Sequence, residues 1–221
     1  MRYSRGMLDS SRPPSPTADA TERAEGAPGV IDHTVSFAHA NVAGLVLLVL
    51  AFAVVLGAYV ALWGLPSRES VRALTRAGWL ATLLPWAVIG VSAVVHEALH
   101  AVGFRAFGGV PWRSIRFGVN WRLLTPFAGT SAPMSARAYR WAGALPGLVL
   151  GVAPAVAGLA LGSGWLASYG AFMLGAAGGD AVALWAIRRV PSGARVRDSR
   201  HRVGCEVLAR PDAGSASGAA A

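Results

Sequence analysis

The chain has 221 residues, of which 54% are hydrophobic and only 14% are charged. Soluble domains usually carry about 25% charged residues, so this composition indicates an integral membrane protein of one domain rather than a soluble protein. The net charge is +9 and every basic residue is an arginine, but the arginines are spread over the connections between apolar segments. That distribution argues against a nucleic-acid-binding face and favours contact with lipid headgroups.

The first 38 residues are expected to form a disordered, cytoplasmic N-terminal tail. Residues 1–30 contain turn-forming residues without helical or strand periodicity. Such a stretch cannot bury a core, and it is too long and too polar to begin a signal peptide. Residues 209–221 are small and polar and are predicted to form a disordered C-terminal tail. The membrane domain would then comprise residues 39–208.

Four apolar segments follow the N-terminal tail, each long enough to cross the hydrocarbon of a bilayer. We therefore expect an all-α integral membrane protein with about four transmembrane helices. Four spans place 17 arginines on one side of the membrane and three on the other. By the positive-inside rule, both termini would be cytoplasmic in a multi-pass protein of the cell membrane. The segments cover residues 41–65, 79–104, 141–161 and 165–187.

The connection between the second and third segments carries a different pattern. Within residues 115–123, apolar side chains alternate with polar or small ones. A period of two is typical of a strand with one apolar face, and a strand needs a partner. This connection is predicted to be a short extended segment or a β-hairpin closing near Pro126, with an interfacial loop as the alternative.

Residues 96–100 read His96-Glu97-Ala98-Leu99-His100 and lie near the end of the second apolar segment. On a helix, residues four apart share a face, so the two imidazoles can hold one zinc ion. The glutamate beside the first histidine can then act as general base on a water molecule. The alternative is a chance HExxH on a helix that reaches the interface, but ionisable side chains in lipid usually indicate function.

Asp180 in the fourth segment is the best candidate for a third ligand. His96 precedes Arg105 by nine residues, and Asp180 precedes Arg188 by eight. Both residues therefore lie about 12 Å inside the same membrane boundary. Gly178 and Gly179 would allow the helix of Asp180 to come close. The alternative for this carboxylate is a packing role, bonded to a hydroxyl or paired with an arginine; the rival ligands are His33, His39, Asp198, His201 and Glu206.

Two further polar residues receive no catalytic role from the sequence. Ser92 lies one turn before His96, where it could support the site by a hydrogen bond or bond to a carbonyl of its own helix. Cys205 is the only cysteine, so no intramolecular disulfide can form, and a lone thiol in a polar tail is usually inert.

Residues 96–109, HEALHAVGFRAFGG, resemble the active-site helix of site-2-protease-like intramembrane metalloproteases. A closer resemblance is to the membrane family named putative zincin peptidases. In that family an HExxH helix is followed by an extended segment, a Tyr-Arg, a Leu-Pro and a Gly-Asp. Here these pieces read Tyr139-Arg140, Leu145-Pro146 and Gly179-Asp180, and the resemblance covers residues 80–208.

The resemblance implies a zinc-dependent metallopeptidase that cleaves peptide bonds in or beside the membrane, near the cytoplasmic face. His96 and His100 would be metal ligands with Asp180 as the third, and Glu97 would be the catalytic base. The implied partners are membrane lipid and a peptide or membrane-protein substrate; no nucleic acid is implied and no oligomeric state is indicated. The alternative functions are a non-catalytic scaffold, or degenerate peptidase, and a metal transporter.

Overall fold

The computed structural model describes residues 30–67, 72, 76, 78–121, 125–199 and 203–208. Residues Ile31–Leu208 form one compact unit. The disordered tails predicted for residues 1–29 and 209–221 lie outside the described residues. The predicted N-terminal tail extends too far, because residues 30–38 form the strand β1 (Val30–Val35) and the beginning of the first helix.

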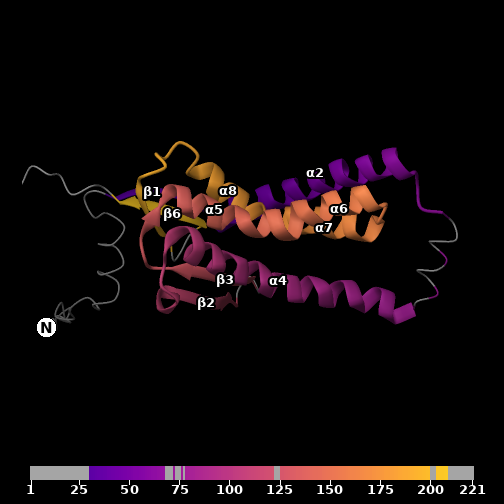
Figure 1. The fold of residues 1–221 in the computed structure, drawn as a ribbon, viewed down its shortest axis with the longest axis horizontal. Helices are drawn as coiled ribbons and strands as arrows, with labels where there is room; N and C mark the ends of the chain where they lie inside the picture. The colour runs from indigo at the N-terminus through magenta and orange to yellow at the C-terminus, as the bar shows by residue number, and fades with distance from the viewer. Residues whose placement is uncertain are drawn as a thin grey trace, which may run out of the picture. The chain divides into compact units, whose positions relative to one another are not determined.

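Three long helical rods dominate this unit (Figure 1). All three are long and apolar enough to cross a membrane. Apolar side chains can face lipid along the whole length of such a helix, while its backbone groups bond internally. The rods are α2 (Phe37–Trp63), α4 (Gly78–Gly108) and a continuous run of α5 (Ala136–Pro146), η2 (Gly147–Val152) and α6 (Ala153–Leu161).

The fourth expected span is not a single helix. Its residues form α7 (Gly164–Ala176) and α8 (Gly178–Ala186), which are separated by a turn at Ala177. α7 packs between α2 and the η2–α6 part of the third rod, whereas α8 packs against α2, α5 and β6. The break gives α8 a direction of its own and separates Asp180 from the apolar helix before it.

Strands form two small sheets, so the expectation of an all-α protein is only partly correct. In one sheet the order is β1-β6-β5-β4, in which β4 pairs with β5, and β5 with β6, in antiparallel fashion. β1 at the start of the domain and β6 at its end are neighbours in this sheet. The three later strands are β4 (Met134–Ser135), β5 (Arg195–Asp198) and β6 (Val203–Leu208).

The second sheet lies between α4 and α5 in the chain, where the alternating pattern predicted a strand. After η1 (Trp112–Ser114), β2 (Ile115–Asn120) pairs antiparallel with β3 (Thr125–Thr130). The last pair joins Asn120 to Thr125, so the two strands close just before Pro126, which itself lies within β3 opposite Val119. β3 rather than β2 packs against α4.

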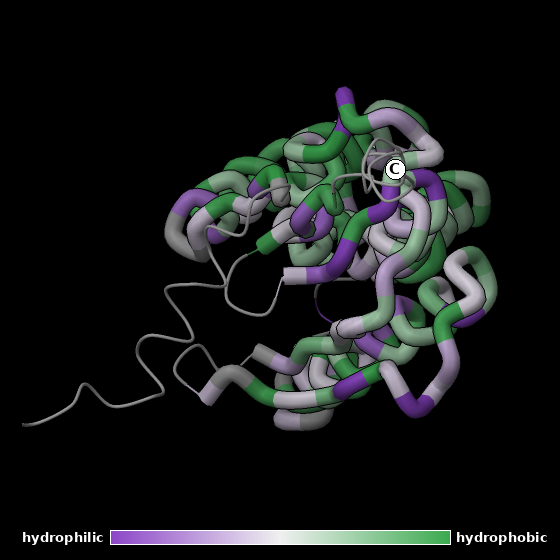
Figure 2. Tube along the Cα trace, turned by 90° about the vertical axis from the view of Figure 1, so that its left-hand side faces the viewer, coloured by the Kyte–Doolittle hydropathy of each residue, from purple (hydrophilic) through white to green (hydrophobic). Residues whose placement is uncertain are grey.

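The larger of the two buried clusters among the described residues lies where the strands meet the helices. Figure 2 faces this end and shows hydrophilic segments on strands and connections, in front of helices that are mostly hydrophobic. The core joins the end of α4, the beginning of α5, the residues after α8 and the four-stranded sheet. Its largest fully buried side chains are those of Met134, Ile187, Val110, Val196, Pro146 and Cys205.

Candidate metal centre

α4 carries the two histidines and the glutamate of the HExxH sequence. His96 and His100 lie on one face of the helix, with ring centroids 5.0 Å apart. His100 is buried, and His96 and Glu97 are half-buried. All three side chains line the same cavity, which also reaches α2, β3, α8 and both C-terminal strands.

Asp180 lies in the first turn of α8 and reaches both imidazoles. Its Oδ2 atom is 2.9 Å from His96 Nε2, and its Oδ1 atom is 3.2 Å from His100 Nε2. Each residue offers one ligand atom, and these atoms all lie within 4.8 Å of one another. The structure therefore brings together the three residues that the sequence suggested as metal ligands.

This donor set fits a zinc ion. Imidazole nitrogens and carboxylate oxygens are ordinary zinc ligands, and one such atom from each residue lies within 4.8 Å of the other two. Two imidazoles and one carboxylate leave a fourth position open, as in catalytic rather than structural zinc sites. Among the described residues, no other group of three His, Cys, Asp or Glu side chains could share a metal ion.

The position of Asp180 depends on a close approach between α8 and α2. A Cβ atom added to Gly178 would lie 2.4 Å from the Cα of Gly44, so a side chain there would force the helices apart. The prediction that Gly178 and Gly179 bring α8 close to a neighbour thus holds for Gly178, but the neighbour is α2 rather than α4. Gly179 has open space beside it and lines the cavity.

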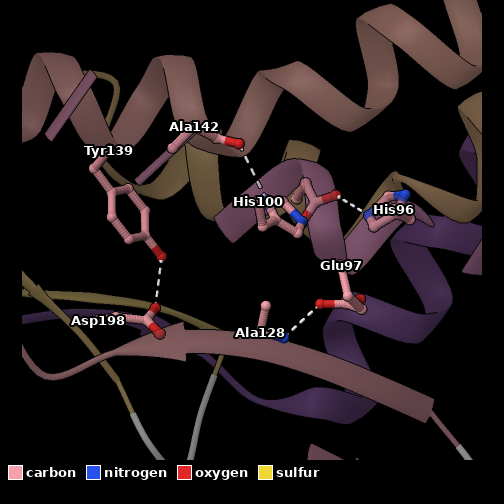
Figure 3. Close-up of polar contacts among 8 residues, drawn as sticks. His96, Glu97, His100, Ala128, Tyr139, Ala142 and Asp198 are labelled. Carbon is pink, nitrogen blue, oxygen red and sulfur yellow. Dashed lines mark hydrogen bonds and ion pairs between the residues drawn. The ribbon is translucent and has the colours of Figure 1, made fainter. Parts of the chain in front are cut away.

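A carbonyl group of α5 orients the His100 ring (Figure 3). The Nδ1 atom of His100 is 3.1 Å from the Ala142 carbonyl oxygen. A carbonyl only accepts, so Nδ1 carries the proton and Nε2 is left as the metal-binding atom. Ala142 is four residues before Pro146, which has no N–H group to donate to that carbonyl. The proline therefore leaves the Ala142 carbonyl available to His100.

Close packing of α4 on α5 makes this bond possible. A Cβ atom added to Gly103 would lie 2.7 Å from the Cα of Ala142. Only glycine at this position lets the two helices approach so closely. Gly103, in the turn after His100, thus permits the helix contact that brings the Ala142 carbonyl to the imidazole.

Glu97 points from α4 toward the edge of β3 (Figure 3). Its Oε2 atom accepts a hydrogen bond from the backbone N–H of Ala128, at a distance of 2.5 Å. The N–H of Ala128 is thereby directed away from β2 and into the cavity. β3 thus places backbone groups beside the predicted catalytic base.

The cavity around these groups has a volume of about 600 Å³. This volume is typical of small-molecule and peptide-binding sites, which run from about 300 to 1,000 Å³. One wall is β3, and the opposite wall is formed by α2 and α8. Residues of β3 that line the cavity are Pro126, Phe127 and Ala128.

Asp198 is a second buried carboxylate in this cavity that the sequence named only as a rival ligand. Its Oδ1 atom accepts a hydrogen bond from the Tyr139 hydroxyl at 3.1 Å (Figure 3). The backbone N–H of Thr130 also bonds to this carboxylate. Burial raises the pKa of Asp198 to about 7, although both hydrogen bonds and the nearby His100 oppose that shift. The alternation within β5 could have identified it, since Val196 and Asp198 share the inward face.

The remaining rival ligands do not join the metal group. His39 contacts the Ser36 hydroxyl at 2.6 Å at the beginning of α2, and Glu206 pairs with Arg197 at 2.6 Å. His33 lies in β1 away from the group, and His201 lies outside the described residues.

The observed surroundings of Ser92 and Cys205 differ from those expected from the sequence. The Ser92 hydroxyl is 2.8 Å from the Tyr169 hydroxyl of α7, so it bonds neither its own helix nor Asp180. Cys205 is fully buried in β6 rather than placed in a polar tail. Burial raises the pKa of its thiol to about 12, which keeps the group protonated and unreactive.

Comparison with known proteins identifies the family of this region. Residues 88–195 match the model of the family described as "Putative zincin peptidase". The match contains His96, Glu97, His100 and Asp180 but ends before Asp198. No curated protein and no solved structure matches the chain, so the likeness to site-2 proteases stays a prediction. Over these residues the chain is similar to that family.

Proposed function

We propose that this protein, whose residues 88–195 match the putative zincin peptidase model, is a zinc-dependent metallopeptidase of the cell membrane. The observation that carries the proposal is the meeting of His96, His100 and Asp180 beside Glu97 in one cavity. Two elements far apart in the sequence contribute to this group, which a chance HExxH would not require. Three apolar helices of sufficient length support a location in the membrane.

The donor set would hold zinc through the Nε2 atoms of both histidines and a carboxylate oxygen of Asp180. A zinc ion supplies Lewis acidity that polarises a peptide carbonyl. Ala142 fixes the His100 ring by accepting its Nδ1 proton, as other ligand histidines are fixed by their outer partners. Asp180 is fixed in turn by the contact between α8 and α2.

Glu97 would act as general base. Its carboxylate takes a proton from the attacking water and later gives that proton to the leaving amine. The N–H of Ala128 holds this carboxylate at the cavity wall. An extended peptide lying along β3 would therefore place its scissile bond next to Glu97. β3 is the strand of the β2–β3 pair that borders the cavity.

The chain would cross the membrane several times, with both termini in the cytoplasm and the site near that face. His100 and His96 precede Gly108, the last residue of α4, by about 12 and 18 Å along the helix. The metal group would thus lie at the depth of the lipid chains, close to the end that carries the strands. Its substrates would be peptide segments in or next to the membrane.

The test compares purified wild type with Glu97→Gln, His96→Ala and Asp180→Ala in detergent. Zinc content is measured for each, and cleavage is followed with fluorescently labelled casein and a quenched transmembrane peptide. Glu97→Gln should keep zinc and lose cleavage by about 100- to 10,000-fold, because it removes the general base alone. The two ligand variants should lose both zinc and cleavage.

Glu206→Gln is the matched control, because Glu206 is paired with Arg197 outside the metal group. It should retain zinc and cleavage. Equal cleavage by wild type and Glu97→Gln would refute the peptidase and favour a non-catalytic scaffold. The metal centre itself would be refuted if the wild-type protein contained no zinc and its stability did not change when chelators were added.

A further inference from the structure

A second cavity, of about 540 Å³, lies between α5, α8 and the connection that follows α8. It is separate from the metal group. The described residues that line it include two arginines and no acidic residue. They are Arg137, Arg140, Trp141, Ala144, Leu184 and Ser192.

Arg140 is built into the wall of this cavity. Its Nη2 atom donates to the carbonyl oxygens of Ile187 and Val190, both at 2.5 Å, and its Nη1 atom donates to the Ser192 hydroxyl at 3.4 Å. These acceptors are neutral, so they satisfy the N–H groups without compensating the charge. The half-buried guanidinium therefore has no negatively charged group among these hydrogen-bond partners.

Arg137 adds a second cation one turn earlier on α5. It forms no ion pair with any described carboxylate, and its side chain is exposed. Its backbone N–H donates to the Ser192 carbonyl, which ties the connection after α8 to α5. Two guanidinium groups without a counter-ion create a local field that favours an anion.

The other side of the cavity is apolar. Arg137, Trp141 and Ala144 lie at spacings of four and three residues, so they share one face of α5. Trp141 is 50% exposed, and Leu184 from α8 lies opposite, in contact with the position of Gly143. The lining thus changes from charged to apolar along α5, starting at the first residues of the Ala136–Leu161 candidate span.

We propose that this cavity binds the headgroup of an anionic phospholipid. Arg137 and Arg140 would contact the phosphate oxygens, and Trp141 and Leu184 would contact the first carbons of an acyl chain. A soluble anion would use the charged half only, whereas a lipid uses both halves. The beginning of a candidate membrane span is the level at which headgroups lie, and basic pockets between membrane helices suit acidic headgroups.

The test measures lipid binding by the detergent-solubilised protein. Dioleoylphosphatidylglycerol should bind more tightly than dioleoylphosphatidylcholine, and Arg137→Gln should weaken phosphatidylglycerol binding about fivefold, since an arginine near an anionic headgroup contributes about that factor. Arg137 is chosen because it is exposed, whereas Arg140 also holds the carbonyls after α8. An unchanged melting temperature without lipid shows that the variant is folded.

Arg113→Gln is the matched control, since Arg113 is an exposed arginine in η1 that does not line the cavity. It should bind phosphatidylglycerol as wild type does, and glycerol 3-phosphate should not compete. Equal affinity for the two lipids, or an equal loss in Arg113→Gln, would overturn the proposal. Effective competition by glycerol 3-phosphate would also overturn it, in favour of a soluble phosphate ligand.

Discussion

The two halves of α4 have similar apolar sequences but very different surroundings. In the first half, Trp79, Trp86 and Val91 are 65–69% exposed. In the second half, Ala101 and Phe104 are 1% and 4% exposed, because α5 and β3 pack on this part of the helix. His96, Glu97 and His100 lie where the first environment changes into the second.

This contrast shows why hydropathy alone could not locate the protein-facing surface. Lipid chains are as apolar as a protein core, so a helix in a membrane needs no polar face to separate them. What distinguishes the second half is the small residue Gly103, which admits α5, and the aromatic ring of Phe104, which fills the space beside His100. Tight packing of α5 on this half positions the histidines, and His96, Glu97 and His100 also line the cavity.

The largest expected difference in the free energy of unfolding is between the alanine variants of two phenylalanines that lie three residues apart in α4. Phe104 is buried beside His100 and Tyr139, whereas Phe107 is 46% exposed. Phe104→Ala should lower the free energy of unfolding by about 3–5 kcal/mol, because it leaves a cavity in the core. Phe107→Ala should cost about 1 kcal/mol or less. Denaturant unfolding in detergent measures both, and equal losses would remove the distinction between the environments.

Pro146→Ala should test the role of the proline in zinc affinity apart from its role in fold stability. The new backbone N–H could bond the Ala142 carbonyl and compete with His100 for it. Loss of such an outer partner typically lowers metal affinity by about 10- to 100-fold. The change in stability is the sum of two opposed terms, the gain of a helix-favouring residue and the loss of packing by a fully buried side chain. Zinc titration and thermal unfolding measure the two effects; a loss of stability without a change in zinc affinity would contradict this role.

The sequence allowed much of the site to be predicted because the site depends on local spacing and on depth. The four-residue separation placed both histidines on one face, and distance from arginines at the helix ends placed Asp180 at a similar level. Asp180 lies on a separate helix that begins after a break at Ala177. No proline or charged residue in the sequence indicated this break. The Gly178–Gly44 contact that holds α8 depends on two segments far apart in the chain.

The four-stranded sheet was missed for a similar reason. β1 and β6 are separated by most of the chain, and neither has the long apolar alternation that identified the β2 region. No strand was expected within residues 195–208. Alternate side chains of this segment, Val196 and Asp198, are in fact directed inward, and they complete the core and one wall of the cavity.

Two glycines of α4 should respond to alanine with opposite signs. Gly90 has open space where a Cβ atom would lie, so Gly90→Ala should stabilise the helix by about 0.5–1 kcal/mol. At Gly103 the added Cβ would overlap Ala142, so Gly103→Ala should destabilise by about 1–3 kcal/mol. It should also weaken zinc binding by shifting the carbonyl that orients His100. Thermal unfolding of both variants checks the signs, and stabilisation by Gly103→Ala would mean that α5 can move away freely.

Asp198, in the packed region, should make the stability of the protein depend on pH. Its folded pKa of about 7 exceeds the ordinary value of 3.8, so between these values the folded state binds more protons than the unfolded chain. Stability should therefore fall as pH rises from about 4 to about 7 and level off above 7, with a slope of at most about 1.4 kcal/mol per pH unit. Asp198→Asn should flatten this slope, whereas Asp32→Asn, at an exposed position of β1, should leave it unchanged. Unfolding of the three proteins across that pH range gives the measurement, and an undiminished slope in Asp198→Asn would show that another group is responsible.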